Sequence, residues 1–196
     1  ANRMNAFNVR RATCGLARYL HAEGTAARGV AIGYDSRRMS ERFAKETALV
    51  LCREGVPAYL FDALRPVALL SFAVRRLGAA AGVVITASHN PPEYNGYKLY
   101  GADGAQIGPE TAEAVTREIR ALAYADCQPM PEDEVRAAGL LRVIGEKEID
   151  DAYMERLRTL ILQPELLRRV GSDLRIVYSP LHGSGNVPVR RALREA

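Results

Sequence analysis

The chain has 196 residues, a formal net charge of +4, 48% hydrophobic residues and 26% charged residues. These fractions are typical of a soluble globular protein, and they exclude a disordered or fibrous chain. No apolar run approaches the roughly 18–20 residues that a membrane-spanning helix needs, and no signal-like leader supports secretion. We therefore expect a protein without a membrane partner, built as one domain with the start of a second.

The cysteines indicate the cellular compartment, and the basic residues indicate the kind of partner. Cys14, Cys52 and Cys127 are odd in number, far apart and not in a C-x-x-C pair, so we expect buried thiols in a reducing compartment, most simply the cytoplasm. Only three of the 27 basic residues are lysines, and the arginines are scattered among acids. This pattern argues against nucleic acid as a partner and is compatible with anionic small molecules.

The predicted elements alternate along the chain. Apolar residues three and four apart predict a first helix from Val9 to Leu20 that ends at Gly24. Further helices are expected over 41–54, with Ser40 as N-cap, over 66–78 and over 111–123, and strands over 30–32, 58–61, 81–86 and 97–100. This order predicts an α/β fold with a mostly parallel sheet sandwiched between helices. The Asn95-Gly96 turn allows an antiparallel fourth strand, which would make the sheet mixed.

The pattern changes after residue 124. A polar, proline-bearing stretch over 129–134 indicates a connector, and a helix is predicted over 149–162. Leu174–Tyr178 resembles a new strand, followed by a glycine-rich turn and the first turns of a helix. We therefore expect a whole domain over 1–128, a linker with connecting helices over 129–172, and the truncated start of a second, similar α/β domain over 173–196.

The densest group of reactive residues lies over 86–98. Ser88 follows directly after a predicted parallel strand, at the edge where open α/β sheets bind ligands. His89 is adjacent, and the Asn95-Gly96 turn returns Lys98 to the same end of the sheet. A serine can carry a phosphoryl group, and the two cationic groups can stabilise phosphate charge or move a proton. Each residue alone is more often structural, but the combination favours a catalytic site.

The segment Thr86-Ala87-Ser88-His89-Asn90-Pro91 resembles the phosphoserine loop of the α-D-phosphohexomutase superfamily, which includes phosphoglucomutases and phosphomannomutases. Supporting similarity to the phosphoglucomutase and phosphopentomutase-like branch extends over nearly the whole chain, through Gly33–Arg37, Leu70–Arg75, Asp103–Ile107 and Val177–Gly183. The resemblance implies the fold of domain I of that superfamily.

The resemblance also implies a mechanism. Ser88 would be phosphorylated and would move a phosphoryl group between the C1 and C6 (or C5) hydroxyls of a sugar phosphate, through a bisphosphate intermediate. Lys98 would act as general acid and base with His89 assisting, and Arg37 and Asn90 would bind phosphate. Arg37 would either stabilise charge or hold the loop. The implied cofactors are Mg²⁺, with one ligand from the phosphate on Ser88, and a sugar bisphosphate activator.

Several family features are absent from this sequence. They are the Gly-rich, arginine-bearing segment before the first helix, the Asp-x-Asp-x-Asp metal loop, the sugar-selecting loop and the phosphate-binding final domain. Arg65-Pro66 replaces a common Thr-Pro pair, and His182 is either a cleft residue or part of a structural turn. We therefore expect the chain alone to be inactive and the remaining domains of the same polypeptide to be its partners.

Two other functions compete with the mutase. The chain could be a non-catalytic sugar-phosphate-binding or regulatory module that retains the fold, which the missing segments favour and the intact loop opposes. Nucleic-acid binding rests on the charge alone. The sequence does not fix which sugar is used, since the selecting loops are absent from it.

Overall fold

The computed structural model describes residues 4–195. Its centre is one five-stranded sheet in the order β4-β3-β1-β2-β5. The strands are β1 (Val30–Tyr34), β2 (Ala58–Phe61), β3 (Ala81–Ile85), β4 (Tyr97–Gly101) and β5 (Leu141–Ile144). The pairs β1–β2, β1–β3 and β2–β5 are parallel, and β4 runs antiparallel along β3. The predicted mixed, mostly parallel α/β sheet is therefore confirmed.

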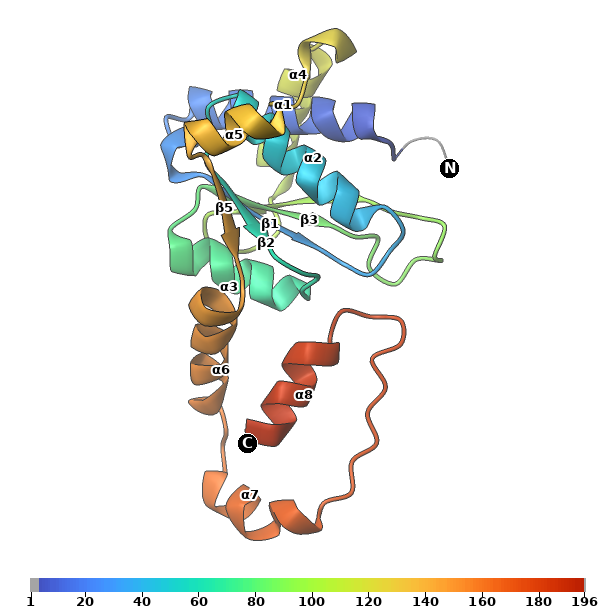
Figure 1. Cartoon of the computed structure of the whole chain (residues 1–196), viewed down its shortest axis with the longest axis vertical. Helices are drawn as coiled ribbons and strands as arrows, with labels where there is room; N and C mark the ends of the chain where they lie inside the picture. The colour runs from blue at the N-terminus through green and yellow to red at the C-terminus, as the bar shows by residue number, and fades with distance from the viewer. Residues whose placement is uncertain (1–3, 196) are drawn as a thin grey trace.

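Helices cover both faces of the sheet (Figure 1). One face carries α1 (Ala6–Ala22), α2 (Ser40–Arg53), α4 (Pro109–Arg120) and α5 (Glu132–Ala138), and the other carries α3 (Val67–Leu77). Beyond α3, away from the sheet, lie α6 (Asp151–Arg158), α7 (Pro164–Val170) and α8 (Asn186–Glu195). Short helical turns are η1 (Ala26–Arg28), η2 (Tyr124–Asp126), η3 (Glu146–Asp150) and η4 (Gly171–Asp173). Within residues 4–195, no helix has both the length and the apolar character needed to cross a membrane.

The sheet separates two apolar cores. Alternate residues of β1 and β3 point to opposite faces, so Ile32 packs toward α1 and α2, whereas Ala31 packs toward α3. Every residue of both strands is buried, which explains their unbroken apolar runs. On β4, Leu99 packs against the first core and Tyr100 against the second.

The structure differs from the prediction over 129–144, which we expected to be linker. Here α5 leads into β5, and β5 pairs with β2, so the sheet continues to Ile144. The strand has only four residues, and Arg142 and Val143 are exposed. A short edge strand of this kind lacks the apolar run that marks β1 and β3.

Two smaller expectations also differ. Ser40 is the first residue of α2 rather than its N-cap, and the cap is Met39 in a left-handed conformation. Leu174–Tyr178 has no strand structure, and Val177 is fully exposed. An isolated strand is not stable because its backbone groups need a neighbouring strand, and nothing in residues 4–195 supplies one. The domain division itself stays a prediction, although the sheet extends past the expected boundary at residue 128.

Candidate active site

A cleft of about 1620 Å³ opens at the carboxyl ends of β1, β2 and β3. The loops that follow these three strands line it, together with β4 and the segment 180–187. All five residues singled out from the sequence lie in this lining: Arg37, Ser88, His89, Asn90 and Lys98. The parallel topology brings them together, because the carboxyl ends of neighbouring parallel strands meet at one edge of the sheet.

Ser88 and Lys98 are in direct contact. The β3–β4 pair places Val84 opposite Lys98, and the Thr86 amide donates a hydrogen bond to the Gly96 carbonyl at 3.0 Å. From this position the Lys98 side chain reaches the loop at the carboxyl end of β3, where its Nζ donates a hydrogen bond to Ser88 Oγ. A primary amine therefore lies against the candidate nucleophilic oxygen.

The backbone of Ser88 has a φ of +56°, in the left-handed region. Among residues 4–195, Met39 is the only other non-glycine residue with a positive φ. This conformation is unfavourable for a residue with a side chain, and it is typically found where function or surrounding contacts require it. The Ser88 amide donates to Thr86 Oγ1 at 3.0 Å.

Arg37 holds the loop that carries Ser88. Its two terminal nitrogens donate to four carbonyls of the loop, those of Ser88 (3.0 Å), Asn90 (2.5 Å), Pro91 (2.7 Å) and Tyr94 (3.0 Å). Its Nε lies 3.3 Å from Asp35 Oδ2, and the side chain is only 12% exposed. Because the whole guanidinium is used in this way, the geometry favours the loop-holding role over direct contact with a phosphate.

His89 and Asn90 are exposed and line the cleft. The Asn90 carbonyl accepts a hydrogen bond from Arg37, so the contact with Arg37 does not use the Asn90 side chain. His182 also lines the cleft, and its carbonyl accepts a hydrogen bond from Ser36 Oγ at 3.0 Å. The glycine-rich turn over 180–187 therefore meets the loop after β1.

Asp35 and Thr86 lie in segments that the resemblance covers, but the sequence prediction gave neither residue a role in the site. Asp35 follows β1, and its carboxylate accepts from the Arg37 amide (2.9 Å), Ser40 Oγ (2.8 Å) and Thr86 Oγ1 (2.5 Å). Ser40 Oγ in turn accepts from Asn95 Nδ2 at 2.9 Å. A carboxylate directly after a buried strand was the signal that could have identified this network.

The carboxylates that the structure describes do not form a metal site by themselves. Within residues 4–195, no group of three or more His, Cys, Asp or Glu side chains is arranged to hold a metal ion. Asp35 is hydrogen-bonded to Thr86 at the start of the Ser88 loop, and both of its oxygens already accept hydrogen bonds. The residues that the structure describes therefore do not complete a Mg²⁺ site without further ligands.

Arg65 also lines the cleft, and its guanidinium binds two carboxylates. It forms a buried ion pair with Asp150 at 2.7 Å, and it contacts Asp62 at 3.1 Å. Arg65 thus joins the loop after β2 to the segment before α6.

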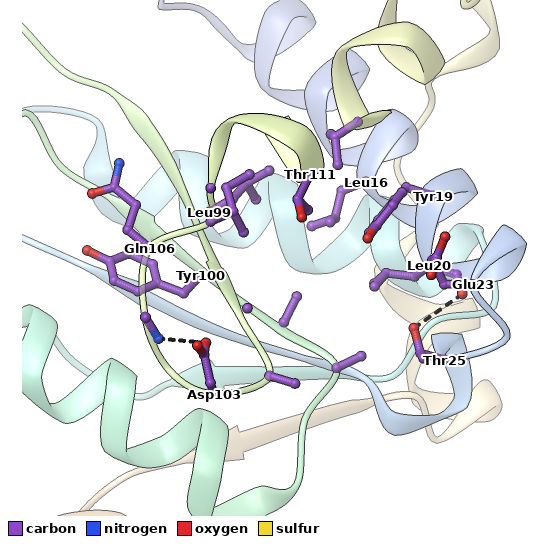
Figure 2. Close-up of a pocket in the computed structure, with 18 of the residues that line it drawn as sticks. Leu16, Tyr19, Leu20, Glu23, Thr25, Leu99, Tyr100, Asp103, Gln106 and Thr111 are labelled. Atoms are coloured by element: carbon purple, nitrogen blue, oxygen red, sulfur yellow. Dashed lines mark hydrogen bonds between the residues drawn. The ribbon is translucent and has the colours of Figure 1, made fainter. Parts of the chain in front are cut away.

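A smaller pocket of about 370 Å³ is lined by residues of α1, β4 and α4. Figure 2 shows Leu16, Tyr19 and Leu20 of α1 lining it together with Leu99 and Tyr100 of β4. Its lining contains none of the five residues singled out from the sequence. The larger cleft is therefore the candidate active site.

Comparison with known proteins bears on the family and the fold of this chain. The family model described as phosphoglucomutase/phosphomannomutase, alpha/beta/alpha domain I, matches residues 1–126. Phosphoglucomutases of two Staphylococcus aureus strains, bovine RF122 and USA300, are each 37% identical over 188 residues, which cover 95% of this chain and 32% of each relative. The chain thus spans about a third of the length of these curated relatives.

Solved structures give the same result for the fold. A crystal structure assigned to a phosphomannomutase of Thermus thermophilus superposes with a TM-score of 0.76 at 28% identity, over 99% of this chain and 40% of that one. The open form of parafusin, a phosphoglucomutase from Paramecium, superposes with a TM-score of 0.74 at 14% identity over 94% of this chain and 37% of that one, which supports the fold alone. The family match, the relatives and the fold together show that this chain belongs to the phosphoglucomutase/phosphomannomutase family.

Proposed function

We propose that this chain is the phosphoryl-carrying part of a phosphosugar mutase, an isomerase-type enzyme, and that Ser88 is the carrier. The contact between Lys98 Nζ and Ser88 Oγ supports this proposal most directly. It places a proton-transfer group against a hydroxyl at the carboxyl edge of the sheet, in a loop that Arg37 holds through four carbonyls. The family membership supports the same class of reaction.

The proposed step transfers one phosphoryl group from Ser88 to a sugar phosphate. A free sugar hydroxyl forms a bond to phosphorus, and the bond between phosphorus and Ser88 Oγ breaks. Lys98 donates a proton to the departing Oγ, and His89 accepts the proton of the attacking hydroxyl. The return step reverses these transfers with the other phosphate of the bisphosphate. Most of the catalysis in such a transfer comes from positioning and charge stabilisation.

The rest of the reaction requires groups outside this sequence. If the full-length protein binds Mg²⁺, the ion would supply charge stabilisation for phosphoryl transfer; in this chain the phosphate on Ser88 would hold it, and the other ligands would come from the remaining domains of the polypeptide. The sugar bisphosphate would act as activator, since it phosphorylates Ser88 when the intermediate is lost. On this proposal the chain alone has little or no mutase activity.

The test is the phosphorylation state and turnover of the full-length protein. We expect phosphate on the Ser88 peptide by mass spectrometry and mutase turnover with a hexose or pentose phosphate, both lost in Ser88→Ala. Ser172→Ala is the matched control, because Ser172 is exposed in η4. Lys98→Met should keep the serine and lower kcat about 100-fold or more.

Two results would contradict the proposal. Turnover that persists in Ser88→Ala would show that another group carries the phosphoryl. Full-length protein that binds sugar phosphates without turnover, and without phosphate on Ser88, would instead support the non-catalytic binding module.

A further inference from the structure

We infer that Asp35 and Thr86 are positioning residues that hold the Ser88 backbone in its left-handed conformation. They do so through two consecutive hydrogen bonds, which we call the Asp35–Thr86 relay: Ser88 N to Thr86 Oγ1, and Thr86 Oγ1 to Asp35 Oδ2. The catalytic consequence of the relay rests on the proposed function, whereas the relay itself can be tested without activity.

The direction of each hydrogen bond in the relay is fixed. An ionised carboxylate only accepts hydrogen bonds, so the Thr86 hydroxyl hydrogen points to Asp35 across 2.5 Å. The hydroxyl oxygen then presents its lone pairs to the Ser88 amide, which donates to it at 3.0 Å. Removing the hydroxyl would therefore remove the acceptor of the Ser88 amide, whereas removing the carboxylate charge would release the hydroxyl from the orientation in which it accepts from that amide.

Asp35 is itself held by four donor groups, which belong to three residues. The Arg37 amide and Ser40 Oγ donate to Oδ1, while Thr86 donates to Oδ2 and Arg37 Nε lies 3.3 Å from it. Hydrogen bonds to an ionised group are shorter and stronger than those between neutral groups. The single carboxylate thus links the end of β1, the start of α2 and the end of β3.

The relay is needed because the Ser88 backbone has a left-handed conformation. For a residue with a side chain, this conformation persists only where surrounding contacts determine it. The relay anchors the Ser88 amide, and Arg37 Nη2 anchors the Ser88 carbonyl at 3.0 Å. With both backbone groups fixed, the direction of the Cβ is also fixed, and Oγ is held against Lys98.

The direct test is hydrogen exchange of the Ser88 amide in the 196-residue chain, measured by NMR. Thr86→Val keeps the volume and removes the hydroxyl, so the Ser88 amide should exchange about tenfold faster. Asp35→Asn should also make the exchange faster, because its amide group would face donors and the Thr86 hydroxyl would lose its charged acceptor. Thr86→Ser should restore the slow exchange, since it retains the hydroxyl.

The matched control is Thr116→Val in α4, which removes a hydroxyl that donates to the Ala112 carbonyl at 2.7 Å. It should leave the Ser88 amide unchanged. If Thr86→Val does not fold, Asp35→Asn tests the same relay with a side chain of nearly equal size. Unchanged exchange at Ser88 in a folded Thr86→Val or Asp35→Asn variant would overturn the inference.

The second readout is steady-state kinetics of the full-length protein. A misdirected Oγ should lower kcat about 10- to 100-fold, with KM changed by less than about threefold, and Thr86→Ser should recover most of the rate. Faster exchange with an unchanged kcat would overturn the positioning role. If the wild-type full-length protein has no mutase turnover but exchange rises in Thr86→Val, the relay stands and the proposed function fails.

Discussion

Asp150→Asn is expected to lower the free energy of unfolding of this chain by about 3 kcal/mol. Asp150 accepts hydrogen bonds from Arg65 Nε at 3.0 and 3.1 Å and from Nη2 at 2.7 Å. The two side chains are only 9% and 8% exposed. Burial opposes the charge on Arg65, but the hydrogen bonds and charge of Asp150 more than compensate and raise the pKa of Arg65. The substitution leaves that charge buried without its main partner.

The magnitude follows from what remains around Arg65. Breaking a buried ion pair by removing one partner costs about 3–5 kcal/mol. Asp62 still contacts Arg65 at 3.1 Å, although its side chain is 45% exposed, so we take the lower end of that range. In a chain of this size, the corresponding decrease in Tm is about 6–12 °C.

The assay is urea unfolding followed by circular dichroism, with Glu165→Gln as the matched control. Arg168 and Glu165 also form an ion pair at 2.7 Å, but their side chains are 65% and 81% exposed. An exposed pair is worth little, so the control should change stability by less than about 0.5 kcal/mol. The double variant Arg65→Met/Asp150→Leu should recover most of the loss. Equal losses in Asp150→Asn and Glu165→Gln would refute the reasoning.

Two further predictions concern the loop and the thiols. Arg37→Lys keeps the charge but loses the planar set of donors, so proteolysis within 88–94 should become about tenfold faster, whereas Arg42→Lys on the exposed side of α2 should leave the rate unchanged. Burial raises the pKa of the Cys52 thiol from its ordinary value of 9.0 to about 11. Because the thiol ionises at a lower pH in the unfolded chain than in the folded one, its contribution to the free energy of unfolding is fully present below pH 9 and is lost as the pH rises toward 11. Urea unfolding at pH 8 and pH 10.5 should therefore show a larger loss for wild type than for Cys52→Ala, and equal losses would count against this assignment.

Local sequence patterns were enough to predict most strands of the sheet and the position of the candidate site. The strands β1 and β3 are buried on both faces, so their apolar runs stand out in the sequence. Ser88 and Lys98 belong to one hairpin, and the Asn95-Gly96 turn was enough to predict that they lie at the same end of the sheet.

Contacts between distant segments could not be predicted in this way. Arg37 reaches carbonyls more than fifty residues further along the chain, and no periodicity marks such a contact. The same holds for Asp35 and Thr86, whose hydrogen bond depends on the pairing of β1 with β3. Arg65 differed visibly from the family pattern, but its partner Asp150 lies on a separate element.

The late position of β5 in the sequence has a consequence for how the protein is made. Strands β1 to β4 and α1 to α3 are all complete by residue 101. Ala58 of β2, however, pairs with Leu141 of β5, which is synthesised later. Pairing between segments so far apart forms slowly because a long loop must be closed first. During synthesis β2 is therefore a sheet edge with unpaired backbone groups, and such edges can pair with other chains. Four residues of β5, added last, turn this vulnerable edge into an interior strand of the sheet.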